Sequence, residues 1–161
     1  MTPPTDSTPP AADKRALYLD DLAVGDRFTS AGHEIDAEQI KAFAQLFDPQ
    51  PFHLDDEAAK STFFGGLAAS GWHTAAITMR LLVTSGVPLA DGIIGAGGQL
   101  AWPRPTRPGD VLRVECEVTE IVPSRSRPDR GMVSLRCETR NQHGDVLQEF
   151  LPRLVVMRRQ R

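Results

Sequence analysis

The segment His73–Ser85 constrains the fold of this chain more than any other part. Its apolar residues fall on nearly every side of a helix, and Arg80 is its only charged residue. A helix that is apolar all round is typical of one buried inside a protein. The small side chains of Ala75 and Ala76 allow a sheet to approach it closely. The sequence therefore predicts one buried helix that is covered by other elements.

Segments in which apolar and polar residues alternate follow this helix to the C-terminus, as expected for strands. They predict strands over Ile93–Trp102, Val111–Val122, Gly131–Arg140 and Val146–Met157. The last two form a hairpin across the turn Asn141–Asp145. One buried helix followed by an antiparallel meander defines an α+β class.

Shorter elements precede the buried helix. Asp26–Ile35 is predicted as a strand. Asp36 is the expected N-cap of a helix that ends before Pro49, with Gln39 completing a capping box. Asp55–Lys60 is a second short helix, because acidic residues at its start suit the helix dipole. The helix that begins after Asp36 has a predicted apolar face, which consists of Ile40, Phe43, Ala44 and Phe47.

The length and charge of the chain limit its class. A chain of 161 residues suits one domain, and we assign it to residues 17–161. Residues 1–16 are rich in Pro and Thr, which predicts a disordered leader that lacks the features of a signal peptide. The net charge of −3 gives no case for a nucleic-acid partner. No apolar run approaches the roughly 20 residues of a membrane helix, so no membrane partner is expected.

The two cysteines, Cys116 and Cys137, both fall in alternating apolar patterns. We interpret them as reduced core residues of a cytoplasmic protein. Neither belongs to a CxxC motif, and no tight spacing of ligands is present elsewhere. The sequence therefore predicts neither a metal site nor a redox motif.

Asp48 and His53 are the strongest candidates for chemistry. They lie five residues apart on a turn that Pro49 and Pro51 stiffen, just after the first helix. A rigid turn can hold a carboxylate and an imidazole in one relative pose. Together these groups can polarise a water, with Asp48 as its base or its anchor and His53 exchanging a proton near neutral pH.

Four segments of the chain resemble the MaoC-like dehydratase family, which includes the (R)-specific enoyl-CoA hydratases. The Asp-x4-His element is the most specific of the shared features. The resemblance extends from about Leu19 to Val156. The matching segments are Asp20–Phe28, Phe43–His53, Ala69–Thr74 and Trp102–Asp110.

This resemblance implies a single hotdog domain, in which a curved antiparallel sheet wraps around one long helix. It also implies a lyase that adds water reversibly across the 2,3 double bond of an enoyl thioester. Coenzyme A is then the carrier of the substrate, no further cofactor is needed, and the expected assembly is a homodimer or a higher homo-oligomer. Asp48 and His53 take the catalytic positions.

Two further sets of residues follow from this interpretation. Hydration places negative charge on the thioester oxygen, and backbone N–H groups at a helix start can receive it. We assign this oxyanion hole to the amides of His73 and Thr74. Arg104 and Arg107 are candidates for the phosphates of coenzyme A, because guanidinium groups match phosphate oxygens. Structural roles are expected for the imidazoles of His33, His73 and His143.

The sequence departs from the family at four places and leaves two alternatives open. Phe47 replaces a Gly before the catalytic Asp, Gln50 replaces an Asn, Thr74 replaces a Gly, and Thr78-Met79 stands where many hydratases carry a Ser. One alternative is a non-catalytic acyl-CoA-binding hotdog or a partner subunit. The other is an acyl-CoA thioesterase, although the buried helix lacks the acidic residue that such hotdog enzymes use.

Overall fold

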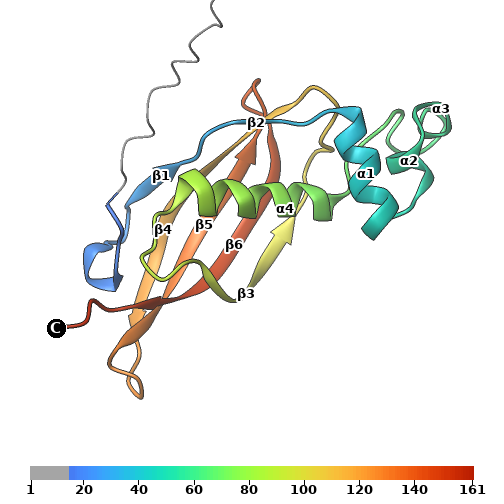
Figure 1. The fold of residues 1–161 in the computed structure, drawn as a ribbon. Coiled ribbons are helices and arrows are strands. Elements are labelled where there is room, and N and C mark those ends of the chain that lie inside the picture. The colour runs from blue at the N-terminus through green and yellow to red at the C-terminus, as the bar shows by residue number, and fades with distance from the viewer. Residues whose placement is uncertain (1–14) are drawn as a thin grey trace, which may run out of the picture.

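The computed structural model describes residues 15–161 as one antiparallel sheet and a set of helices (Figure 1). All but the last two residues of the predicted leader, 1–16, lie outside this described part. The strand order is β1-β4-β5-β6-β3, and β2 pairs with another part of β4. The strands are β1 (Arg27–Thr29), β2 (His33–Glu34), β3 (Ile94–Ala101), β4 (Val111–Pro123), β5 (Arg130–Arg140) and β6 (Val146–Met157).

The C-terminal meander confirms the predicted strands closely. β5 and β6 form the expected hairpin, with Cys137 opposite Phe150 and Thr139 opposite Gln148. β3 carries a bulge between Gly95 and Gly97, in the glycine-rich stretch of the strand. Because β3 pairs only with β6, its other edge is unpaired and forms one of the two edges of the described sheet, the other being at β1.

The prediction of a single strand over Asp26–Ile35 is wrong, because the chain forms two short strands there. Both pair with β4, but the ladder is interrupted between them at Ser30. The Ser30 amide donates to the carbonyl of Val114, and its hydroxyl accepts the Val114 amide, both at 2.9 Å. The side chain of Ser30 thus supplies a hydrogen bond that regular strand pairing would otherwise make.

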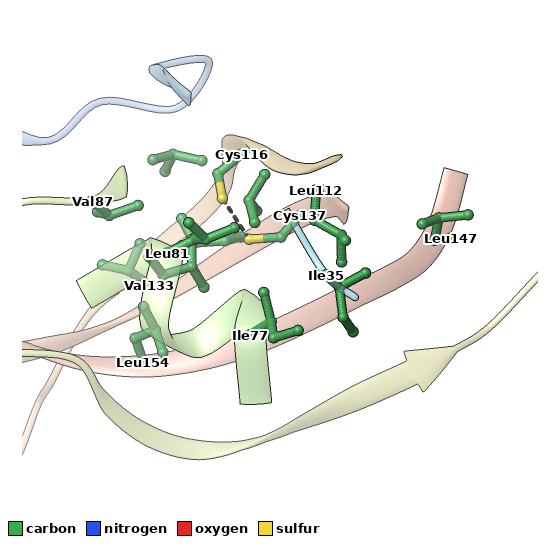
Figure 2. Packing of buried hydrophobic residues seen from close by; sticks show 14 of the residues in the cluster. Ile35, Ile77, Leu81, Val87, Leu112, Cys116, Val133, Cys137, Leu147 and Leu154 are labelled. Carbon is green, nitrogen blue, oxygen red and sulfur yellow. Dashed lines mark hydrogen bonds between the residues drawn. The ribbon is translucent and has the colours of Figure 1, made fainter. Parts of the chain in front are cut away.

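The central helix α4 (Gly71–Leu81) crosses one face of the sheet and continues as the π-helical turn Leu82–Gly86 (Figure 1). Ile77 and Leu81 point from the helix into the core and meet strand residues such as Val133 and Leu154 (Figure 2). This is the arrangement of a single helix against a curved sheet that the α+β prediction requires.

The expectation that this helix is covered on all sides is wrong. Trp72 and Val83 are 60% and 59% exposed, and Met79 is also exposed. The buried face instead carries polar side chains as well as apolar ones, including His73, Thr74 and Thr78. Together with Ala76, the exposed residues form a line at helical spacing, which we call the α4 stripe: Trp72, Ala76, Met79 and Val83.

The remaining helices are α1 (Ala37–Phe47), α2 (Pro51–Leu54) and α3 (Asp56–Ala59), which gather near the start of α4 (Figure 1). Asp36 caps α1 as predicted, accepting the amide of Gln39 at 2.8 Å. The Gln39 side chain does not complete a capping box, because it bonds His33 and the carbonyl of Glu34 instead. Phe47 is 70% exposed, so the predicted apolar face ends before it.

The two cysteines lie in the core, as predicted. Cys116 and Cys137 face each other across β4 and β5, both are free, and the sulfurs are 2.8 Å apart (Figure 2). The adjacent Cys116 thiol and burial raise the pKa of Cys137, which keeps it protonated.

Within residues 15–161, no helix has the length and apolar character that crossing a membrane requires.

Candidate active site

Asp48 occupies the point where α1 ends. It is the C-cap residue, with its amide still bonded to Ala44 at 2.9 Å and with a backbone conformation that is no longer helical. Because Pro49 follows, the helix cannot continue. The chain therefore turns at Asp48 and directs its carboxylate toward the next helical turn.

His53 is held by α2 rather than by an irregular turn. Pro51 occupies the first helical position of α2, where a missing N–H costs nothing. The imidazole is 4% exposed, and its Nδ1 lies 2.6 Å from the carbonyl oxygen of Ala68. Because a carbonyl can only accept, Nδ1 carries a hydrogen and donates it. In the neutral ring Nε2 is then an acceptor.

The structure brings the two predicted residues together. Nε2 of His53 lies 3.3 Å from Oδ2 of Asp48. When the ring is neutral, two acceptors face each other, and a water that donates one hydrogen to each satisfies both. When the ring is protonated, the same atoms form a charged hydrogen bond. The pair can therefore hold a water and take up its proton.

Three groups act on the ionisation of Asp48. Partial burial favours its neutral form and so raises its pKa. Hydrogen bonds from the Gln50 amide and the Ser70 hydroxyl, together with the positive charge of His53, outweigh this effect. The pKa of Asp48 is therefore lowered overall. Nε2 of Gln50 donates to Oδ1 of Asp48 at 2.5 Å. Asp48 is thus held as a carboxylate. The sequence identified Ser70 only as a possible helix cap, and nothing near it in sequence indicated Asp48 as its partner.

The two amides assigned to the oxyanion hole are already used inside α4. The N–H groups of His73 and Thr74 both donate to the carbonyl of Ser70, at 2.9 and 3.1 Å. The amide of Trp72 donates to the Ser70 hydroxyl at 3.3 Å. Gly71 is the first residue of the helix, and its N–H has no partner among the described residues. The amides of His73 and Thr74 are therefore occupied, and the unused amide at the start of α4 is that of Gly71.

A cavity of about 410 Å³ adjoins these groups, a volume in the range of small-molecule sites. Its wall includes His53 and Gly71 and is otherwise largely aromatic and prolyl. Thr74 and Thr106 also line it, and their hydroxyls lie 2.9 Å apart. The remaining lining residues are Phe63, Phe64, Ala69, Trp102, Pro103, Arg104 and Pro105.

The two candidate arginines have different environments. Arg104 borders the cavity with its side chain 63% exposed, and its guanidinium lies 3.2 Å from a carboxylate oxygen of Asp145. The guanidinium of Arg107 instead donates to the carbonyls of Phe64, Gly66 and Leu67. Arg107 therefore holds the loop before α4, and only Arg104 keeps an exposed cationic group at the cavity.

The other histidines lie in different settings. Nε2 of His33 is 2.9 Å from the side-chain oxygen of Gln39, and His143 is exposed in the hairpin turn. His73 is 8% exposed, stacks on Phe43 with ring centroids 4.5 Å apart, and has no partner for Nδ1 within the described chain. Burial, helped by the charge of His33, lowers the pKa of His73 to about 4. It is therefore a neutral packing residue.

This fold and site define a class of hotdog proteins with a carboxylate–imidazole pair beside the start of the central helix. Residues 23–138 match the family described as "MaoC like domain". The chain belongs to this family of MaoC-like dehydratases.

Three relatives illustrate the likeness. The crystal structure of a MaoC-like dehydratase from Rhodospirillum rubrum is 65% identical, covers 91% of this chain and 100% of its own, and superposes with a TM-score of 0.90. The R-hydratase PhaJ1 from Pseudomonas aeruginosa is 27% identical over 89% of this chain and 88% of its own, with a TM-score of 0.72. A 3-hydroxybutyryl-CoA dehydratase from Methylorubrum extorquens is 34% identical over 70% of this chain and 71% of its own.

Proposed function

We propose that the protein is a hydro-lyase that adds water reversibly across the 2,3 double bond of an enoyl-CoA and gives a 3-hydroxyacyl-CoA. The observation that carries this proposal is the 3.3 Å approach of Asp48 and His53 beside the cavity. The 3-hydroxybutyryl-CoA dehydratase among its relatives supports the substrate class. We place this reaction in fatty acid metabolism. A cytoplasmic location is also proposed, because the two free cysteines suit a reducing compartment.

The two side chains have different roles in this reaction. The lowered pKa of Asp48 makes it a weak base at neutral pH, so it anchors the water. Nε2 of His53 accepts the proton, because Nδ1 is already committed to the carbonyl of Ala68. The water oxygen bonds to C3, and the electrons of the double bond move toward the thioester oxygen. The proton held by His53 is then delivered to C2, which restores the pair.

The negative charge that forms on the thioester oxygen needs a donor. The amide of Gly71 supplies it, since this N–H lies at the start of α4, borders the cavity and is unused. A preorganised donor of this kind lowers a barrier by about 3 kcal/mol. The helix start adds a favourable partial positive charge at the same point.

Coenzyme A extends from the cavity toward Arg104 in this proposal. Arg104 is the exposed cation on the rim, and pairing with a phosphate would exchange its contact with Asp145 for a stronger one. Arg107 supports the rim through three backbone carbonyls and has no direct role in binding the carrier.

A homodimer completes the proposal. β3 leaves one edge of the sheet unpaired, and an exposed edge invites pairing with a second chain. The α4 stripe adds exposed apolar surface, and Ile94 of β3 is 44% exposed. A two-fold axis beside β3 would pair the edges of two copies and cover this surface.

Hydration of crotonyl-CoA by the purified protein tests the function. We expect turnover that falls at least about a hundredfold in Asp48→Asn. Asp56→Asn makes the same chemical change at an exposed carboxylate paired with Lys41, and it should keep the parental rate. Binding without turnover would identify an acyl-CoA-binding module or partner subunit. Release of free coenzyme A would identify a thioesterase.

A further inference from the structure

Trp102 forms the cavity wall that faces the start of α4. It follows β3, and its indole lies against the α-carbon of Gly71. A β-carbon on residue 71 would lie 2.6–2.9 Å from atoms of this ring, closer than real side chains approach. The indole therefore occupies space that only glycine leaves open.

The orientation of this indole is set from inside the core. Gln148 on β6 is fully buried, and its Oε1 accepts the Nε1–H of Trp102 at 2.9 Å. The amide nitrogen of Gln148 donates to the hydroxyl of Thr78 at 3.0 Å. Because an indole N–H can only donate, the orientation of the Gln148 amide is fixed.

The chain of hydrogen bonds continues into the central helix. The Thr78 hydroxyl lies 2.8 Å from the carbonyl of Thr74, to which it donates, and 2.7 Å from the hydroxyl of Thr139. Thr78 and Thr139 are as buried as Gln148. A buried polar network in which each of these side-chain polar atoms has a partner holds its members in one arrangement.

We propose that Trp102 limits the length of the acyl group that the cavity accepts, and that Gln148 is the positioning residue that holds it there. This inference rests on the proposed hydratase function. The rigid indole beside Gly71 closes the space next to the oxyanion donor, so short 2-enoyl chains are the preferred substrates. Without Gln148 the indole N–H has no buried hydrogen-bond acceptor and can turn toward solvent, since Trp102 is already 41% exposed.

The ratio of kcat/KM for octenoyl-CoA to that for crotonyl-CoA tests the proposal. We expect this ratio to rise at least about tenfold in Trp102→Leu and in Gln148→Met, because fitting even one methylene changes selectivity by about that factor. Trp102→Phe, which keeps an aromatic ring, should change it less. Thr139→Val removes a buried hydroxyl that bonds Thr78 but not Gln148, and it should leave the ratio unchanged.

Fluorescence gives a second readout that does not depend on turnover. The chain has two tryptophans, so Trp72→Phe leaves Trp102 as the sole emitter. Adding Gln148→Met to this background should shift the emission to longer wavelength as the indole meets more water. An unchanged spectrum would refute the positioning role.

The kinetic outcomes separate the two proposals. A parent that hydrates neither substrate refutes the hydratase function and, with it, the role of Trp102 in selectivity. If the parent is active and Trp102→Leu shows the same ratio of kcat/KM values, the role of Trp102 in selectivity is refuted and the hydratase function stands. An equal change in Thr139→Val would show that general loosening of the core, and not Trp102, sets the ratio.

Discussion

Asp48 and His53 meet through Oδ2 and Nε2 at 3.3 Å, and neither atom has a hydrogen to offer the other while the imidazole is neutral. We expect Asp48→Asn and His53→Gln each to lower hydration at least about a hundredfold. The double variant should lose much less than the product of the single losses, because both groups act on one water. Steady-state kinetics on crotonyl-CoA measures this, and full activity in both single variants would place the chemistry elsewhere.

Replacing Gly71 with alanine should disturb the site, because the new methyl group would displace the indole of Trp102. The added methyl group collides with the indole, and overpacking of this kind costs about 1–3 kcal/mol. We expect Gly71→Ala to lower both the thermal midpoint and kcat. In a Trp102→Leu background the same substitution should cost much less, and equal losses in the two backgrounds would contradict the contact.

Ser70 should control the ionisation of Asp48. Its hydroxyl is among the groups that lower the pKa of Asp48, so this pKa rises in Ser70→Ala. The part of the acid limb of the kcat/KM profile that reports protonation of Asp48 should then move to higher pH. Ser30→Ala is the matched control, because it also removes a buried hydroxyl that accepts a backbone amide. It should lower stability and leave the acid limb in place.

His73 should make the fold sensitive to acid. Its pKa is about 4 in the folded protein and about 6.5 when unfolded, so the unfolded chain binds more protons below neutral pH. Stability from this residue is complete above about pH 6.5 and falls toward pH 4, by at most about 3 kcal/mol. Denaturant unfolding of His73→Leu should show a flatter dependence in this window. His143→Gln, at an exposed turn, should retain the parental slope.

The α4 stripe should hold two copies together. We expect the parent to behave as a dimer at micromolar concentration in light scattering. Val83→Arg places a charge on the exposed apolar line and should shift the protein toward monomer. Thr84→Arg adds the same charge on the next exposed residue, off this line, and should disturb the dimer less. A monomeric parent would refute the assembly.

The sequence predicted the meander and the approach of Asp48 to His53 because both depend on local signals. Alternating residues define β4 to β6, and Pro49 and Pro51 set the turn between Asp48 and His53. The exposure of Met79 was not predictable, since an apolar residue fits a core or an interface equally well. Hydropathy alone does not separate these cases.

The unused amide at the start of α4 lies two residues before the nearer of the amides assigned from the sequence to the oxyanion hole. The start of α4 at Gly71 was recognised, but the identity of the unused amide depends on where the Ser70 carbonyl points. The wall built by Trp102 and Gln148 was missed for a related reason. These residues are 46 positions apart, and no periodicity connects them.

Arg107 joins two segments that lie about forty positions apart in the chain. By bonding the carbonyls of Phe64, Gly66 and Leu67, its guanidinium ties the loop before α4 to the loop after β3. Secreted proteins commonly make such a link with a disulfide, which a reducing compartment would break. Here the crosslink is a single ionic side chain, so the mouth of the cavity keeps its shape whatever the redox state of its surroundings.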